Sequence, residues 1–150
     1  MRLRSHVLAL VMFFVAACGD GASTPTAPTA NTATTAAAAN GSWSGNIVLN
    51  VGCTAPLPQV FAWTGIIRTA ANGGVETVVS VQRVGVSNET HAATITGRRI
   101  TFTVDIDGPY TFVGDFGADF RSLSGTFTGR SCNILSTVVT PTGTWTGTKQ

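Results

Sequence analysis

The chain has 150 residues, which leaves room for one domain once targeting segments are removed. It carries nine lysine and arginine residues against seven aspartate and glutamate residues, and two of the nine, Arg2 and Arg4, belong to the N-terminal segment described next. The other seven basic residues are scattered and form no basic stripe of the kind that binds phosphate backbones. We therefore expect no nucleic-acid partner.

Residues 1–17 have the pattern of a secretory signal peptide. Arg2 and Arg4 form a positive n-region, and residues 7–17 (VLALVMFFVAA) are all apolar. As a helix these eleven residues would span roughly 16 Å, about half of a ~30 Å hydrocarbon core. The run is too short to cross a bilayer and has the length of a signal h-region.

The end of this signal resembles the bacterial lipobox. Val15, Ala16 and Ala17 are small residues in front of Cys18. The resemblance implies cleavage before Cys18 and a diacylglyceryl group on its thiol, which would anchor the protein to a membrane outside the cytoplasm. The next residue is Gly19 rather than the aspartate of inner-membrane retention signals, which implies the outer membrane if the cell has one.

Residues 18–40 differ in composition from the rest of the chain. After Cys18, alanine, threonine and proline dominate, a single charged residue occurs, and large apolar side chains are absent. Such a segment buries too little surface to offset the entropy of ordering it. The four alanines at 36–39 would make only one helical turn, which is unstable alone. We expect a flexible tether.

Residues 41–150 alternate between apolar and polar side chains, with turn signals at short intervals, which is the pattern of half-buried β-strands. About eight strands are predicted, around residues 43–49, 61–67, 75–81, 92–96, 100–106, 110–116, 123–127 and 145–147. Short strands joined by tight turns favour an all-β antiparallel up-and-down meander. Closure into a small barrel would remove its exposed edges.

Two features favour closure of the barrel. The first and last strands carry near copies of one motif, GSWSG at 41–45 and GTWTG at 143–147. With Cys18 lipidated, Cys53 and Cys132 are left to form a disulfide in an oxidising compartment. Cys53 follows the first strand and Cys132 precedes the last, so a disulfide between them requires those strands to be neighbours.

The Gly41-Ser-Trp43 motif on the opening strand resembles the lipocalin and avidin group of small barrels. The resemblance implies that Trp43 packs across one barrel end near a basic residue of the last strand, a part that Lys149 could take, with Trp145 as a further packing residue.

The chain is also similar in size, tether and disulfide to lipid-tethered lysozyme-inhibitor barrels. That likeness implies a protruding loop, for which residues 50–59, with Pro56 and Pro58, are the candidate.

Catalytic and metal-binding groups are scarce. His91 is the single histidine after the signal, and beside Glu89 it is predicted to be an exposed loop residue; no Ser-His-Asp pattern accompanies it. The pairs Asp105 with Asp107 and Asp115 with Asp119 offer oxygens for a loose calcium site, but turn geometry explains them. The sequence predicts no catalytic residues, no metal and no cofactor.

The sequence therefore predicts a non-catalytic binding or interaction module of the cell envelope, which binds an envelope protein or a small ligand. Two alternatives are an inhibitor of an envelope hydrolase such as lysozyme and a carrier of a small apolar ligand. Nine aromatic residues are expected to face inward and fill the barrel, which would leave any ligand at the rim; the interleaved glycines could instead line a cavity. They are Trp43, Phe61, Trp63, Phe102, Tyr110, Phe112, Phe116, Phe127 and Trp145.

Overall fold

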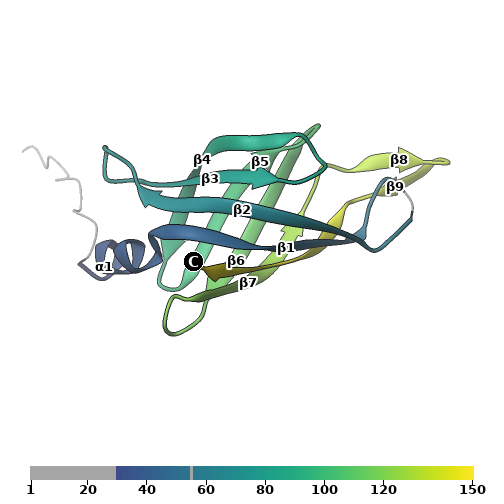
Figure 1. The fold of residues 1–150 in the computed structure, drawn as a ribbon. Coiled ribbons are helices and arrows are strands. Elements are labelled where there is room, and N and C mark those ends of the chain that lie inside the picture. Colours follow the sequence, from purple (N-terminus) through teal and green to yellow (C-terminus); the bar gives the residue numbers. More distant parts are fainter. Residues whose placement is uncertain (1–29, 55) are drawn as a thin grey trace, which may run out of the picture.

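The computed structural model describes residues 30–54 and 56–150, so the predicted signal, Cys18 and the first part of the predicted tether lie outside the described residues. One helix is followed by ten strands (Figure 1). These are α1 (Ala30–Ala39), β1 (Gly41–Val51), β2 (Gln59–Thr69), β3 (Val75–Val81), β4 (Val86–Thr96), β5 (Arg99–Asp105), β6 (Pro109–Phe116), β7 (Ser122–Thr128), β8 (Cys132–Ile134), β9 (Thr137–Val139) and β10 (Thr142–Lys149).

Eight of these strands form a closed antiparallel barrel, which confirms the predicted fold class. Neighbours follow chain order from β1 to β7, and β10 pairs with both β7 and β1 to close the wall. The closing ladder places Trp43 opposite Lys149 and Ile47 opposite Trp145. β8 and β9 form a separate two-stranded hairpin, inserted between β7 and β10.

The side chains alternate across the wall as the sequence pattern requires. Of the nine aromatic residues predicted to face inward, seven are buried, and Phe61 and Tyr110 pack against the core while partly exposed. At the centre, the ring of Trp145 meets those of Trp63, Phe102 and Phe112 at centroid distances of 5.5 to 5.7 Å. Edge-on geometry of this kind adds to the stabilisation from buried area.

Buried tryptophans need a partner for the indole N–H, and the wall supplies backbone carbonyls. Trp63 Nε1 donates to the Thr146 carbonyl at 2.8 Å, and Trp145 Nε1 donates to the Val113 carbonyl at 3.1 Å. The rings fit because a glycine lies beneath each. A Cβ at Gly147 would stand 2.8 Å from the Trp63 ring, and one at Gly114 would stand 2.6 Å from the Trp145 ring.

Helix α1 covers one end of the barrel, which we call the closed end (Figure 1). Ala36 and Ala39 are buried. Lys149 Nζ donates to the Ala38 carbonyl and Trp43 Nε1 to the Ala39 carbonyl, each at 3.0 Å. The prediction of a flexible tether was therefore wrong over Ala30–Ala39. Tertiary packing and capping of the last carbonyls provide stability that an isolated helix lacks.

The opposite end, which we call the open end, is formed by the β1–β2 loop, the β5–β6 turn and the β8–β9 hairpin (Figure 1). A disulfide joins Cys53 in the β1–β2 loop to Cys132 at the start of β8, with 6.1 Å between their Cα atoms. This confirms the predicted pairing. It also fixes the base of the hairpin against the loop that begins after β1.

Candidate functional site

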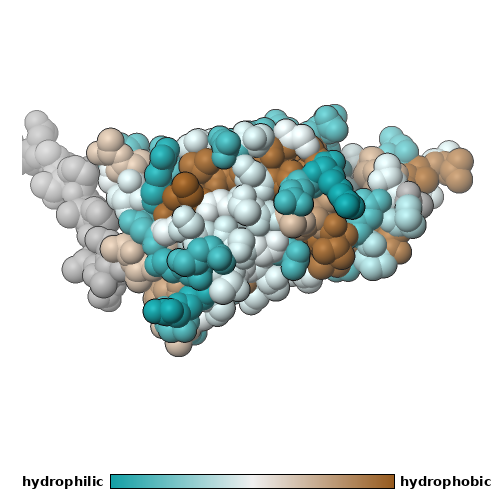
Figure 2. Space-filling view, in the orientation of Figure 1, coloured by the Kyte–Doolittle hydropathy of each residue, from teal (hydrophilic) through white to brown (hydrophobic). Residues whose placement is uncertain are grey.

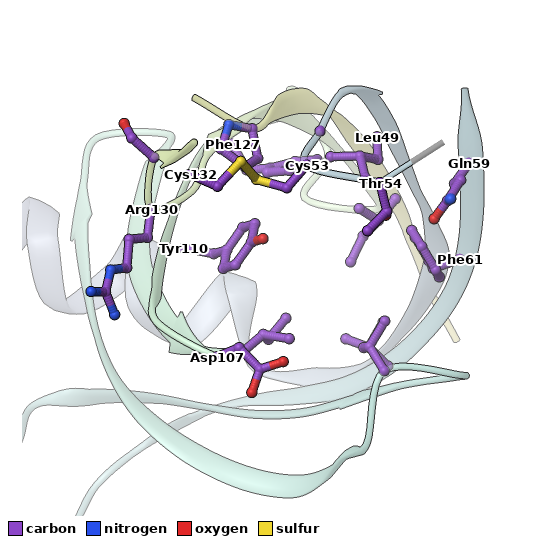
Figure 3. Close-up of a pocket in the computed structure, with 17 residues that line it drawn as sticks. Leu49, Cys53, Thr54, Gln59, Phe61, Asp107, Tyr110, Phe127, Arg130 and Cys132 are labelled. Atoms are coloured by element: carbon purple, nitrogen blue, oxygen red, sulfur yellow. A yellow bond between two sulfur atoms is a disulfide. The ribbon is translucent and has the colours of Figure 1, made fainter. Parts of the chain in front are cut away.

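A cavity of about 550 Å³ lies inside the barrel at the open end. Its walls are largely aliphatic and aromatic, with Tyr110 and Phe61 on facing sides and the Cys53–Cys132 disulfide along the rim (Figure 3). Ligand pockets in proteins have volumes of about 300–1,000 Å³. The prediction that side chains fill the whole interior was therefore wrong for this half.

The cavity exists because the inward residues of the open half are small or do not reach across the barrel. Strands β1 to β3 contribute Ile47, Leu49 and Val81, and the β3–β4 turn contributes Val84. Each is aliphatic, so none spans the interior as the tryptophans do in the other half. Of the two aromatic residues that are only partly buried, Phe61 stays against the wall, and Tyr110 projects inward without crossing the cavity (Figure 3).

Six polar or charged residues line the cavity: Thr54, Gln59 and Ser131, together with Asp107 and Tyr110 on the β5–β6 side and Arg130 in the β7–β8 connection. Tyr110 on β6 directs its hydroxyl toward the middle of the cavity, whereas the guanidinium of Arg130 points away from it (Figure 3). Asp107 lies at the edge, in the β5–β6 turn. Burial and, next, the negative charge of Asp107 raise the pKa of the Tyr110 hydroxyl above the ordinary value for tyrosine. The hydroxyl therefore stays protonated at neutral pH.

The residues expected at one barrel end are only partly brought together. Trp43 and Lys149 both lie at the closed end, where they cap α1. The Trp43 ring packs on Phe116 with centroids 5.5 Å apart. Trp145 lies deeper, in the central aromatic cluster, and is not an end residue as expected. Trp145 and Lys149 are four residues apart on β10, and a strand rises about 3.3 Å per residue, so the two side chains lie at different depths in the barrel.

The expectation of an exposed His91 was wrong. His91 lies within β4, opposite Thr77 on the inner face, and its side chain is only 15% exposed. Its Nε2 is 3.5 Å from a Glu89 carboxylate oxygen. Strand β4 begins at Val86, six residues before the predicted start. The prediction missed these residues because Glu89 and His91 occupy inward positions, where the alternating pattern requires apolar residues.

The carboxylates behave mostly as turn residues. Asp105 accepts a hydrogen bond from the Gly108 amide at 2.8 Å, and Asp119 accepts one from the Arg121 amide at 3.0 Å. Asp115 lies on an exposed strand face, 4.0 Å from Arg99. Asp107 is the exception, since it adopts a positive φ of 53° and lines the cavity. Its proximity to Tyr110 follows from the short β5–β6 turn, since the two residues are three apart in the sequence. That both residues border a cavity depends on closure of the barrel, which no local pattern in the sequence indicates.

Within residues 30–54 and 56–150, His, Cys, Asp and Glu side chains form no group of three or more suited to hold a metal ion. The same part of the chain contains no helix with the length and apolar character needed to cross a membrane.

No protein-family model matches the chain, and no curated protein matches it significantly in sequence. Among solved structures, it is similar to a protein of unknown function from the DUF3598 family of Nostoc punctiforme. The TM-score is 0.47 and the sequence identity 17%, over 77% of this chain and 49% of the other. The chain thus spans about half the length of this structural neighbour.

Proposed function

We propose that this chain is a lipid-anchored envelope protein whose barrel binds a small apolar molecule in the cavity at the open end. The observation that carries the binding proposal is the cavity itself: about 550 Å³, with largely apolar walls and a mouth beside a disulfide-fixed loop. An apolar molecule that enters gains roughly 25 cal/mol for each Å² of apolar surface removed from water. The site supports non-catalytic binding.

The test is a fluorescence titration with N-phenyl-1-naphthylamine, an uncharged apolar probe. We expect saturable binding by the purified full chain. Leu49→Trp places a large ring in the cavity and should weaken binding at least tenfold. Ile66→Trp is the matched control, because Ile66 lies on the outer face of β2 and is 43% exposed. Absence of saturable binding, or equal binding by both variants, would contradict the proposal.

The proposed anchor rests on the lipobox-like sequence that ends at Cys18. A single acyl chain gives only marginal membrane binding, whereas two chains hold a protein stably. In bacteria given labelled palmitate, the unmodified chain should incorporate label and fractionate with the envelope membranes. Cys18→Ser should do neither. Equal label in both chains would refute lipidation at this residue.

A second candidate function is inhibition of an envelope hydrolase, and the β8–β9 hairpin favours it. The loop expected for this role, residues 50–59, instead borders the cavity through Gly52, Cys53 and Thr54. The hairpin projects beyond the barrel, and its tip shows hydrophobic atoms (Figures 1 and 2). Leu135 is 96% exposed and, like Ser136, has a positive φ. A strained, exposed apolar residue is a feature of recognition tips.

This candidate is tested with a lysozyme activity assay on cell-wall substrate. If the hairpin inhibits, the full chain should lower the rate and Leu135→Asp should abolish the effect. Ile66→Asp, which places the same charge on the barrel wall, should still inhibit. Unchanged lysozyme activity at high excess of the full chain would rule out lysozyme as the target.

A further inference from the structure

The polar groups of the cavity are few and unevenly placed. The single tyrosine of the chain, Tyr110, presents its hydroxyl to the interior (Figure 3). The nearest charge identified as acting on it is the carboxylate of Asp107. A ligand seated among the apolar walls therefore meets the Tyr110 hydroxyl and, close to it, the negative charge of Asp107, while Thr54, Gln59 and Ser131 are further polar residues of the lining.

Tyr110 is held in place from two sides. Its ring packs against Phe127, with ring centroids 6.2 Å apart. The backbone at Gly129 approaches the ring so closely that a Cβ there would stand 2.8 Å from the carbon that bears the hydroxyl. Because the ring is confined, its hydroxyl has a defined position and can favour one ligand orientation.

No cation compensates Asp107 inside the cavity. Arg130 lines the wall with its aliphatic stem, which packs over Gly108, while its guanidinium points away (Figure 3). Within the described residues, the ion pairs are Arg68 with Glu76, His91 with Glu89 and Arg99 with Asp115, and none of these residues lines the cavity. A ligand carboxylate would lose hydration and meet a like charge, which is unfavourable.

We propose that the cavity selects uncharged amphiphiles, molecules with an apolar body and one hydroxyl or carbonyl group, over the corresponding carboxylates. The Tyr110 hydroxyl donates a hydrogen bond to the polar group of the ligand, and Asp107 repels anions. This inference rests on the proposed function, because it names the chemical class of ligand for the same cavity.

The experiment is competition against bound N-phenyl-1-naphthylamine at neutral pH with decanol, decanoate and decylamine, which share one chain and differ in charge. Decanol should displace the probe at about tenfold lower concentration than decanoate, as expected for one unpaired like-charge contact at moderate dielectric. Tyr110→Phe should weaken decanol about fivefold relative to the probe, the value of one hydrogen bond, with the probe affinity measured separately for each variant.

Asp107→Asn provides the matched test of charge. Asparagine tolerates the positive φ of this position, so the turn should be retained. In this variant the affinity for decanoate should rise about threefold to tenfold relative to the affinity for decanol.

The outcomes separate the two proposals. If the probe does not bind, the proposed function fails. If the probe binds but decanoate competes as well as decanol, or if Tyr110→Phe leaves decanol unaffected, only the selectivity inference fails. Strongest displacement by decylamine would overturn the preference for uncharged amphiphiles, because attraction to Asp107 would then outweigh the hydrogen bond from Tyr110.

Discussion

The two ends of the barrel use the same alternating strand pattern and differ in what fills them. At the closed end, Trp43 and Phe116 pack together under α1. At the open end, aliphatic side chains such as Ile47 and Leu49 line a cavity of about 550 Å³. Alternation decides which side chains point inward. The size of the inward residue at each level along the barrel axis decides whether that level is solid or hollow.

The largest expected effect concerns the disulfide of the open end. On the chain-entropy model, the closed loop of 79 residues contributes about 4.5 kcal/mol. The free energy of unfolding of a whole domain is only roughly 5–15 kcal/mol. The double variant Cys53→Ala, Cys132→Ala should therefore unfold at much lower denaturant concentration. Limited proteolysis should cut first in the β1–β2 loop and the hairpin, while α1 stays protected.

Cys18→Ser, which keeps the disulfide, is the control for that comparison. An unchanged unfolding midpoint in the double variant, or first cleavage within α1, would show that the disulfide does not stabilise the open end.

The next effect compares a filled level with a hollow one on the same strand. Trp63 and Phe61 both face inward from β2, two residues apart, but Trp63 is 5% exposed and Phe61 borders the cavity. Trp63→Ala should cost about 3–5 kcal/mol of unfolding free energy, and Phe61→Ala about half as much. Thermal or denaturant unfolding measures both. Equal losses would mean that the open half is as tightly packed as the closed half.

A smaller effect tests the attachment of α1. Lys149→Met removes the hydrogen bond from Nζ to the Ala38 carbonyl and the positive charge at the helix C-terminus. The loss should be about 0.5–1 kcal/mol, seen as faster hydrogen exchange of α1 amides. Arg83→Met, an exposed change in the β3–β4 turn, should leave exchange in α1 as it is. Identical exchange in both variants would show that Lys149 does not hold the helix.

The smallest expected effect is the pH dependence of stability that comes from the Tyr110 hydroxyl at the open end. Because the chain has one tyrosine, phenolate absorbance reports Tyr110 alone. Burial first and Asp107 second raise its folded pKa, so the unfolded state loses this proton first and stability falls as pH rises above about 10. Asp107→Asn should lower the folded midpoint. A midpoint that does not move would show that Asp107 is too far away to act.

The fold could be predicted from the sequence because two-residue periodicity is a local signal with a single geometric meaning. The ladder that puts Trp43 opposite Lys149 and the disulfide between Cys53 and Cys132 both follow from closing the meander. His91 was misplaced because polar residues at inward positions of β4 interrupt that signal.

The rest depends on long-range contacts that periodicity does not encode. The alanines of α1 form a helix because Ala36 and Ala39 are buried against the barrel and because Lys149, more than a hundred residues away, donates to the last turn. The β8–β9 hairpin turns at Leu135 and Ser136. Both have positive φ, although neither is among the residue types that favour positive φ in hairpin turns, so the sequence does not indicate this turn. The cavity depends on which inward residues of different strands lie at the same level along the barrel axis. The pairing register of the strands in the closed barrel sets these levels.

Both ends of the described chain lie at the closed end: α1 begins there, and the Gln150 amide donates to the Ser42 carbonyl at 2.9 Å (Figure 1). A molecule fixed to a surface through either end therefore presents its cavity to the surrounding medium. Ligand exchange would not require detachment. The same geometry allows a fluorophore or sensor surface to be attached at Gln150 without blocking the entrance.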